Sequence, residues 1–193
     1  MPELPPNRIT DAKALRALAH PLRWKLLDLI SREGTATATQ CAQEVGESVA
    51  NCSYHLNTLA KYGFVEQAQG GQGREKPWRM TDRQQSWSDL DLDPEGTLAA
   101  QAATTGFLDF QLNQIRERYL TSQLEPDDWR AAVGMNSTNE WLTPDEVLLI
   151  REEITDIMAR YRDRVADPDA RPPGSRAVNM FLSVTVAPGI KSA

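Results

Sequence analysis

Apolar residues recur at helical spacing through the first third of the chain. Leu15 and Leu18 predict a short first helix over residues 11–19. Pro21 suits the first position of a second helix, whose apolar stripe continues until Gly34. This spacing predicts two helices joined at a tight corner.

Capping residues mark where further helices begin. Thr10, Thr37 and Ser48 are expected N-caps. Thr37 and Gln40 have the spacing of a capping box, which predicts a third helix ending at about Val45. Ser48 then opens a fourth helix that continues to about residue 62.

A glycine-rich turn follows the fourth helix. Residues 64–69 predict a short strand and residues 74–81 a return strand, with three glycines in the turn between them. Pro77 removes one backbone donor, so the return strand is expected to be short or irregular there. Three of these helices followed by a hairpin, in this order, predict a winged helix-turn-helix.

The second half of the chain shows another alternation of patterns. We expect a long helix over residues 97–123 and a strand over residues 129–135. A second helix is expected over residues 144–165, because Thr143-Pro144-Asp145-Glu146 is a strong helix start. Alternating apolar residues predict a final strand over residues 178–186.

These elements predict an α+β fold that is mostly helical. The N-terminal winged helix-turn-helix (residues 1–83) is followed by a helix–strand–helix–strand C-terminal domain (residues 84–193). We expect the C-terminal domain to serve dimerisation and to be a candidate for effector binding.

Charge is distributed unevenly between these halves. The net charge is −6, but residues 1–83 carry 11 basic and 9 acidic residues, whereas residues 84–193 carry 10 and 18. The first half is therefore compatible with DNA, and the acidic half is expected to face away from it. No apolar run is long enough to cross a membrane, and the N-terminus does not resemble a signal peptide. A cytoplasmic protein without membrane contact is expected.

Metal and catalytic chemistry find little support in the sequence. Cys41, Cys52, His20 and His55 have the right number for a zinc site, but no pair has the spacing of a zinc clip. Phosphate loops and nucleophile elbows are absent from the sequence. We expect no metal, no cofactor and no enzymatic activity.

The fourth helix carries the candidate DNA-binding face. Val49, Cys52, Leu56 and Leu59 fall on one side of a helical wheel and are expected to face inward. The opposite side offers amides, hydroxyls and one cation, which suit base edges and phosphates. The candidate DNA-contacting residues on this helix and the hairpin are Ser48, Ala50, Asn51, Ser53, Tyr54, His55, Asn57, Thr58, Lys61, Arg74, Lys76 and Arg79. Of these, Asn51, Tyr54 and Asn57 are expected to contact bases, and Ser48, Ser53, His55, Arg74 and Lys76 the DNA backbone.

Three stretches resemble the ArsR-type winged-helix regulators, and most closely a branch whose hairpin carries a Gly-Arg-Glu-aromatic pattern. They are Leu18-Ala19-His20-Pro21-Leu22-Arg23, Thr37-Ala38-Thr39-Gln40-Cys41-Ala42, and the run from Ser53-Tyr54-His55-Leu56 to Glu66. The resemblance covers about residues 10–83. It implies a homodimer on a two-fold symmetric operator in double-stranded DNA, usually as a repressor, with His55 near the DNA. Metal-sensing members carry a Cys-Val-Cys motif before the recognition helix, where this chain has only Cys41, so metal sensing is not expected.

The C-terminal half leaves two questions open. Its long helices have wide apolar faces, and we expect the helix over residues 97–123 to contribute to a homodimer. Candidate residues of an effector pocket are Phe107, Phe110, Trp129, Trp141 and Tyr161, for each of which ordinary core packing is the alternative. A winged helix used for protein contacts, with weak or lost DNA binding, is the alternative function.

Overall fold

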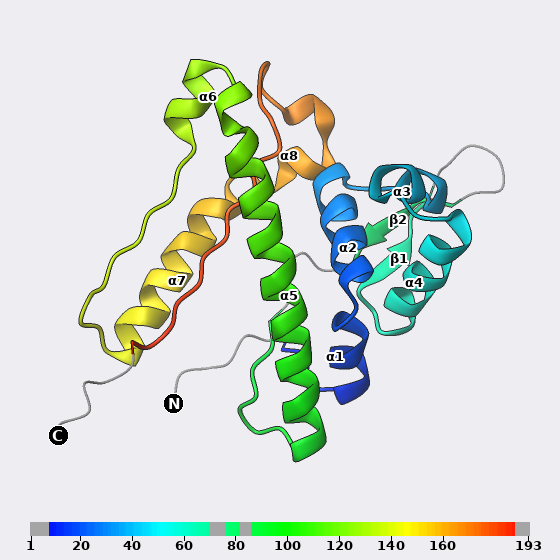
Figure 1. Cartoon of the computed structure of the whole chain (residues 1–193), viewed down its shortest axis with the longest axis horizontal. Coiled ribbons are helices and arrows are strands. Elements are labelled where there is room, and N and C mark those ends of the chain that lie inside the picture. The colour runs from blue at the N-terminus through cyan, green and yellow to red at the C-terminus, as the bar shows by residue number, and fades with distance from the viewer. Residues whose placement is uncertain (1–7, 70–75, 82–85, 188–193) are drawn as a thin grey trace.

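The computed structural model describes residues 8–69, 76–81 and 86–187. Helices dominate it, and two short strands form a small sheet (Figure 1). The helices and strands are α1 (Ala12–Leu18), α2 (Pro21–Glu33), α3 (Ala38–Val45), α4 (Val49–Lys61), β1 (Val65–Gln67), β2 (Trp78–Met80), α5 (Pro94–Thr121), η1 (Ser122–Leu124), α6 (Asp127–Ala132), α7 (Pro144–Ala159), α8 (Asp163–Ala166) and η2 (Pro168–Ala170).

Local side-chain chemistry explains where the first helices begin. Asp11, rather than the expected Thr10, caps α1 by accepting hydrogen bonds from two backbone N–H groups. Pro21 occupies the first turn of α2, as predicted. Thr37 and Gln40 form the predicted reciprocal capping box at α3. These caps satisfy backbone donors that a helix start otherwise leaves without a partner.

The hairpin packs beside the helices through one additional backbone bridge. β1 and β2 pair antiparallel, with Val65 opposite Met80. Ala36, in the connection between α2 and α3, exchanges backbone hydrogen bonds with Trp78. Because β2 begins directly after Pro77, the proline lies outside the strand, as its missing donor predicts. The predicted turn at residues 70–73 and the first two residues of the return strand lie outside the described residues.

One hydrophobic core joins the winged helix to the long helix α5. Leu15, Leu26 and Leu56 are fully buried, and Ala103 on α5 belongs to the same cluster. α5 packs along α1 and also contacts α2. Gly106 marks a close approach, since a Cβ there would lie 3.2 Å from the backbone oxygen of Ala19. The predicted boundary near residue 83 therefore separates segments that share a core.

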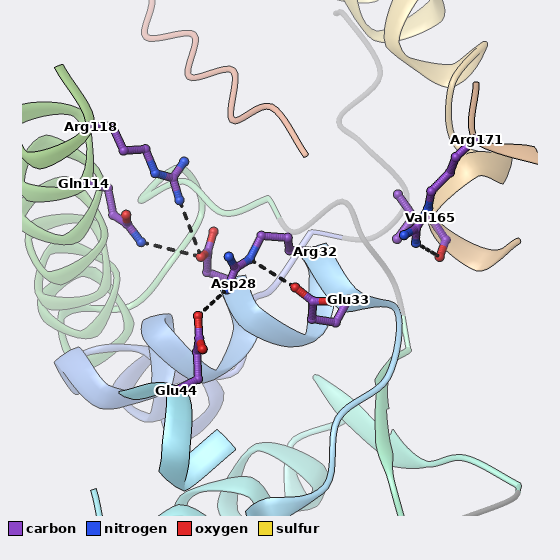
Figure 2. A network of polar contacts seen from close by, with 8 residues as sticks. All are labelled: Asp28, Arg32, Glu33, Glu44, Gln114, Arg118, Val165 and Arg171. Atoms are coloured by element: carbon purple, nitrogen blue, oxygen red, sulfur yellow. Dashed lines mark hydrogen bonds and ion pairs between the residues drawn. The ribbon is translucent and has the colours of Figure 1, made fainter. Parts of the chain in front are cut away.

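Polar contacts also hold α2 between α3 and α5 (Figure 2). Gln114 on α5 donates a hydrogen bond to Asp28, and the Arg118 guanidinium lies 3.9 Å from the same carboxylate. Burial raises the pKa of Asp28, and the neighbouring arginines oppose this shift. One turn further along α2, Arg32 pairs with Glu44 on α3 at 3.2 Å. α2 thus connects α5 to the helix-turn-helix through charged side chains as well as through the core.

The predicted strand over residues 129–135 is wrong, because the first part of this segment is the helix α6. Asp127 and Asp128 occupy the first turn of α6, where carboxylates stabilise the N-terminus of a helix. The alternation of apolar residues had indicated a strand, but a strand needs a neighbour for its backbone groups. The structure offers this segment no strand partner among the described residues.

The final predicted strand is also wrong for this chain on its own. Residues 178–186 run as an extended segment without regular secondary structure. The helix predicted over residues 144–165 begins as expected, with Thr143 and Glu146 forming a capping box, but α7 ends at Ala159 and the short α8 follows. The helix predicted over residues 97–123 is confirmed, although α5 starts three residues earlier at Pro94. The second half is thus helical, and the expected helix–strand–helix–strand order is not formed.

Candidate nucleic-acid interface

The α3–turn–α4 unit has the geometry of a helix-turn-helix. α3 ends at Gly46, whose φ of 73° lies in the left-handed region that glycine adopts at little cost. The backbone N–H of Glu47 then donates to the Ala42 carbonyl oxygen. Ser48 caps α4 by accepting a hydrogen bond from the Asn51 backbone N–H. This short turn fixes the direction in which α4 leaves α3.

The inner face of α4 follows the helical wheel closely. Cys52, Leu56 and Leu59 are fully buried in the core. Val49 differs from the prediction and is exposed, because it lies in the first turn of α4, beyond the edge of the core. His55 is the additional buried residue, only 5% exposed.

The outer face of α4 is polar and accessible. Tyr54 is 64% exposed, and Ala50, Asn57 and Lys61 are also exposed. Ser53 and Thr58 are partly buried at the margins of this face. We call the exposed side formed by these residues, together with Ser48 and Asn51, the outer face of α4.

Hydrogen bonds already orient several side chains on the outer face. The Asn51 amide donates to the Glu47 carboxylate at 2.9 Å. The Asn57 amide donates to the Ser53 carbonyl oxygen, and the Thr58 hydroxyl donates to that of Tyr54. Glu47 is a member of this site that the sequence analysis missed. Its position four residues before Asn51, in the turn, was the available signal.

Behind the outer face lies a cluster built around Arg23 of α2. The Arg23 Nε donates to the Nδ1 of His55 at 3.1 Å, and its Nη1 donates to the Ala17 carbonyl oxygen at 2.6 Å. The rings of His20 and His55 lie 4.3 Å apart, and the Nδ1 of His20 caps α2 through the Leu22 N–H. Arg23 therefore connects the end of α1 to α4, and His55 lies beneath the outer face.

Protonation of His55 is opposed by its surroundings. Burial lowers the pKa of His55, and the nearby His20 and Arg23 lower it further. Since Nδ1 accepts the Arg23 hydrogen bond, the neutral imidazole is the form that this cluster requires. His55 is thus a neutral acceptor that holds Arg23.

This cluster predicts loss of stability in mild acid. The unfolded chain takes up a proton at His55 near its ordinary pKa of about 6.5, whereas the folded chain resists protonation. Because the unfolded state then binds more protons, the free energy of unfolding should fall as pH is lowered from about 7.5 to about 5.5. Urea unfolding at each pH measures this slope. The variant His55→Gln, which keeps an acceptor but does not titrate, should show a shallower slope, and an unchanged slope would contradict the assignment.

The three basic residues predicted to contact DNA from the hairpin differ in their surroundings. Lys76 is exposed at the start of the second described stretch of the hairpin. Arg79 is exposed but paired, since its Nε and Nη2 both contact the Glu66 carboxylate on β1, at 2.9 and 2.7 Å. Arg74 lies outside the described residues. Lys76 and Arg79 therefore share the accessible surface of the hairpin.

The five candidate effector-pocket aromatics are not brought together. Trp141 is fully exposed, Tyr161 is exposed, and Trp129 lies beneath the Arg176 guanidinium. Phe110 is buried in the core. Among the described residues, none of the five rings contacts another of the five. The small-molecule effector stays a prediction.

Phe107 belongs to a different aromatic cluster, which the sequence analysis missed. Its ring lies 4.8 Å from Trp24, 5.8 Å from Trp87 and 5.9 Å from Phe181. Trp87 also donates a hydrogen bond to Thr104. The cluster joins α2, α5 and the C-terminal segment, which are far apart in sequence, so no local pattern indicated it.

The two cysteines lie inside the helix-turn-helix rather than on its surface. Both are free and fully buried. Burial raises the pKa of the Cys41 thiol to about 11, and the pKa of Cys52 is also raised. The part of the chain that the structure describes contains no group of three or more metal-ligating side chains. None of the helices described there combines the length and the hydrophobicity that a membrane span requires.

Part of the chain matches a known family of domains. Residues 18–68 match a protein family described as a helix-turn-helix domain, a stretch that runs from the end of α1 to just past β1. The predicted resemblance to the ArsR type of helix-turn-helix is confirmed over these residues.

A curated relative is similar to the same part of the chain. It is the probable mercury resistance operon repressor of Streptomyces lividans, 40% identical over 62 residues. The match covers 32% of this chain and 49% of the relative, so the chain spans about half the length of the relative it matches.

Proposed function

We propose that this protein is a sequence-specific DNA-binding transcription regulator whose α4 enters the major groove. The observation that carries the proposal is the contrast between the two faces of α4. Its inner face is fixed by the core and by the Arg23–His55 hydrogen bond, while its outer face presents Tyr54, Asn51 and Asn57. A helix held rigidly from behind, with a polar face free, suits base readout.

The proposal assigns roles on the outer face. Asn51, Tyr54 and Asn57 contact base edges, while Ser48, Ser53 and the hairpin residue Lys76 contact the DNA backbone. His55 acts from beneath the face by holding Arg23, because its burial keeps it from the DNA surface. Glu47 orients the Asn51 amide.

The proposed regulator acts as a homodimer on a two-fold symmetric operator, as a repressor. Support comes from the repressor named among its relatives and from exposed apolar side chains on α5. Leu98, Leu108 and Leu112 are exposed along this helix, which lies beside the winged helix. Two-fold dimers of helix-turn-helix proteins place their recognition helices about 34–36 Å apart, one turn of DNA.

The test is fluorescence anisotropy with labelled DNA from the region upstream of the protein's own gene. Specific binding should weaken steeply between low and moderate salt, because phosphate contacts release counterions. Scrambled DNA of the same length is the control. Equal binding to both DNAs would show that this upstream region does not contain the operator. Binding to a protein partner that does not weaken with salt would instead favour the alternative, a winged helix used for protein contacts.

Asn51→Ala should relax sequence preference at one base pair by about 1–3 kcal/mol, as expected for loss of a bidentate amide contact. The matched control is Asn113→Ala, an exposed amide on α5. Anisotropy against a panel of single-base operator variants measures the change. An unchanged preference profile for Asn51→Ala would remove this residue from the base-contacting set.

A further inference from the structure

The C-terminal half carries an apolar surface that the chain itself leaves uncovered. Fourteen large apolar side chains between residues 133 and 186 are exposed in the described part of the chain. Nine of them lie on α7 or between residues 178 and 186, and at about 60 Å² for each they expose on the order of 500 Å², close to the apolar part of the roughly 800 Å² per partner in a standard interface. Monomers rarely leave a contiguous apolar patch larger than a few hundred Å² in water.

Helix α7 supplies much of this surface. None of its residues is buried. Ile150 and Ile157 are exposed and fall on one stripe of the helix, with Ile154 half-buried beside them, and the exposed Tyr161 follows two residues past its end. Figure 1 shows α7 on the opposite side of α5 from α3 and α4.

The extended segment over residues 177–187 supplies five more of these side chains and has unpaired backbone groups. No residue of this described segment takes part in a hydrogen bond, whether backbone or side chain. Preceding it, Arg176 pairs with Glu125 and so fixes where the segment starts. An extended stretch with free N–H and C=O groups is an edge that another strand can pair with.

Phe181 packs against the rest of the chain, whereas the apolar side chains on the other side of this segment are exposed. Phe181 points toward α5 and contacts Phe107. The alternate side chains are 50–98% exposed and all apolar, namely Val178, Met180, Leu182, Val184 and Val186. An alternating strand normally turns its apolar side to a core, so this side requires a cover from outside the chain.

We propose that residues 178–186 form a β-strand only in the dimer, by pairing antiparallel with the same segment of a second copy. The stripe of α7 then closes over the apolar side of the two-stranded ribbon. This inference deepens the homodimer of the proposed function and rests on it. It also accounts for the strand that the sequence pattern predicts and the single chain does not form.

A second copy fits this surface for a geometric reason. A two-fold axis through the segment makes identical strands antiparallel, so the apolar positions of one copy lie opposite the apolar positions of the other. Full overlap of residues 178–186 places Leu182 on the axis, opposite the partner's Leu182. The neighbouring Ser183 then lies opposite the partner's Phe181.

Single-cysteine crosslinking tests the pairing directly in the full chain. Leu182→Cys should give a covalent dimer on a non-reducing gel after treatment with diamide, since residues opposite each other lie about 5 Å apart. Ser183→Cys is the matched control, because its two copies lie about 8 Å apart, beyond the reach of a disulfide of about 7 Å. We expect at least about tenfold faster crosslinking at 182. The native Cys41 and Cys52 are fully buried and provide the background.

The crosslinking pattern distinguishes a shifted register from the absence of strand pairing. A covalent dimer at one other apolar position of the segment, with its neighbours inert, supports pairing in a shifted register. Equal crosslinking at every position, or at none, overturns the strand pairing.

Association in solution gives an independent measurement. Leu182→Asp should weaken the dimer at least about 100-fold by sedimentation equilibrium, because it would bury a charge on the axis. Thr185→Asp, an exposed position on the other side of the segment, should change it little. A wild-type dimer that tolerates Leu182→Asp overturns the strand pairing alone. A monomeric wild-type chain overturns both the pairing and the homodimer, while DNA binding is judged separately by anisotropy.

Discussion

Leu56→Ala is expected to lower the free energy of unfolding by about 3 kcal/mol, within the range of about 2–5 kcal/mol for leucine truncation in a core. Leu56 is fully buried on the inner face of α4 and belongs to the core that joins α2, α4 and α5. The loss combines the transfer free energy of the removed methyl groups with the cavity they leave. Since small domains are stable by about 5–15 kcal/mol, this one substitution removes a large share.

Urea unfolding followed by circular dichroism at 222 nm measures this effect. Leu56→Met, which keeps the volume, should cost less than about 1.5 kcal/mol. Tyr54→Ala, two residues away on the exposed outer face, should stay within about 0.5 kcal/mol of the wild type while weakening DNA binding. Similar losses of stability for Leu56→Ala and Tyr54→Ala would contradict the assignment of the two faces of α4.

Arg23→Met is expected to lower the free energy of unfolding by about 2–3 kcal/mol, because it leaves buried acceptors without a donor. The substitution removes the hydrogen bonds to the Ala17 carbonyl oxygen and to the Nδ1 of His55. The methionine side chain has similar length, so little packing volume is lost. The connection between the end of α1 and α4 is lost as well, so operator affinity should fall although Arg23 lies behind α4.

The control is Lys25→Met, an exposed cation two residues along the same helix. It removes the same unit of charge and should change neither stability nor specificity. Arg23→Met and His55→Ala should be non-additive in a double-mutant cycle, because both remove the same hydrogen bond. Strict additivity would show that the two side chains contribute independently.

Local signals were sufficient to predict the winged helix. Thr37, Ser48 and Pro21 act within three or four residues of themselves, through backbone N–H groups or a fixed φ angle, so the sequence states their effect directly. Helical spacing correctly predicts that Cys52, Leu56 and Leu59 of α4 are buried, whereas Val49 at the start of the helix is exposed. His55 is also buried, which the spacing did not indicate, and its hydrogen-bond partner Arg23 lies 32 residues earlier in the chain.

The wrong predictions have a common cause. Alternating apolar residues over 129–135 and 178–186 state a preference for extended backbone, but a strand also requires a neighbour whose backbone groups pair with it. In the first segment the acidic first turn favoured a helix. The aromatic cluster of Trp24, Trp87, Phe107 and Phe181 was missed for a related reason, since only the tertiary fold brings its members together.

Gly106 has a consequence for how α5 can move. Because the backbone of Ala19 approaches this position so closely, a Cβ there would require α1 or α5 to shift by a few tenths of an ångström. Sliding α5 along its axis by one helical turn would bring Ala103 or Phe110, which carry side chains, toward the same carbonyl oxygen. The close contact at Gly106 therefore opposes a displacement of α5 along its own axis.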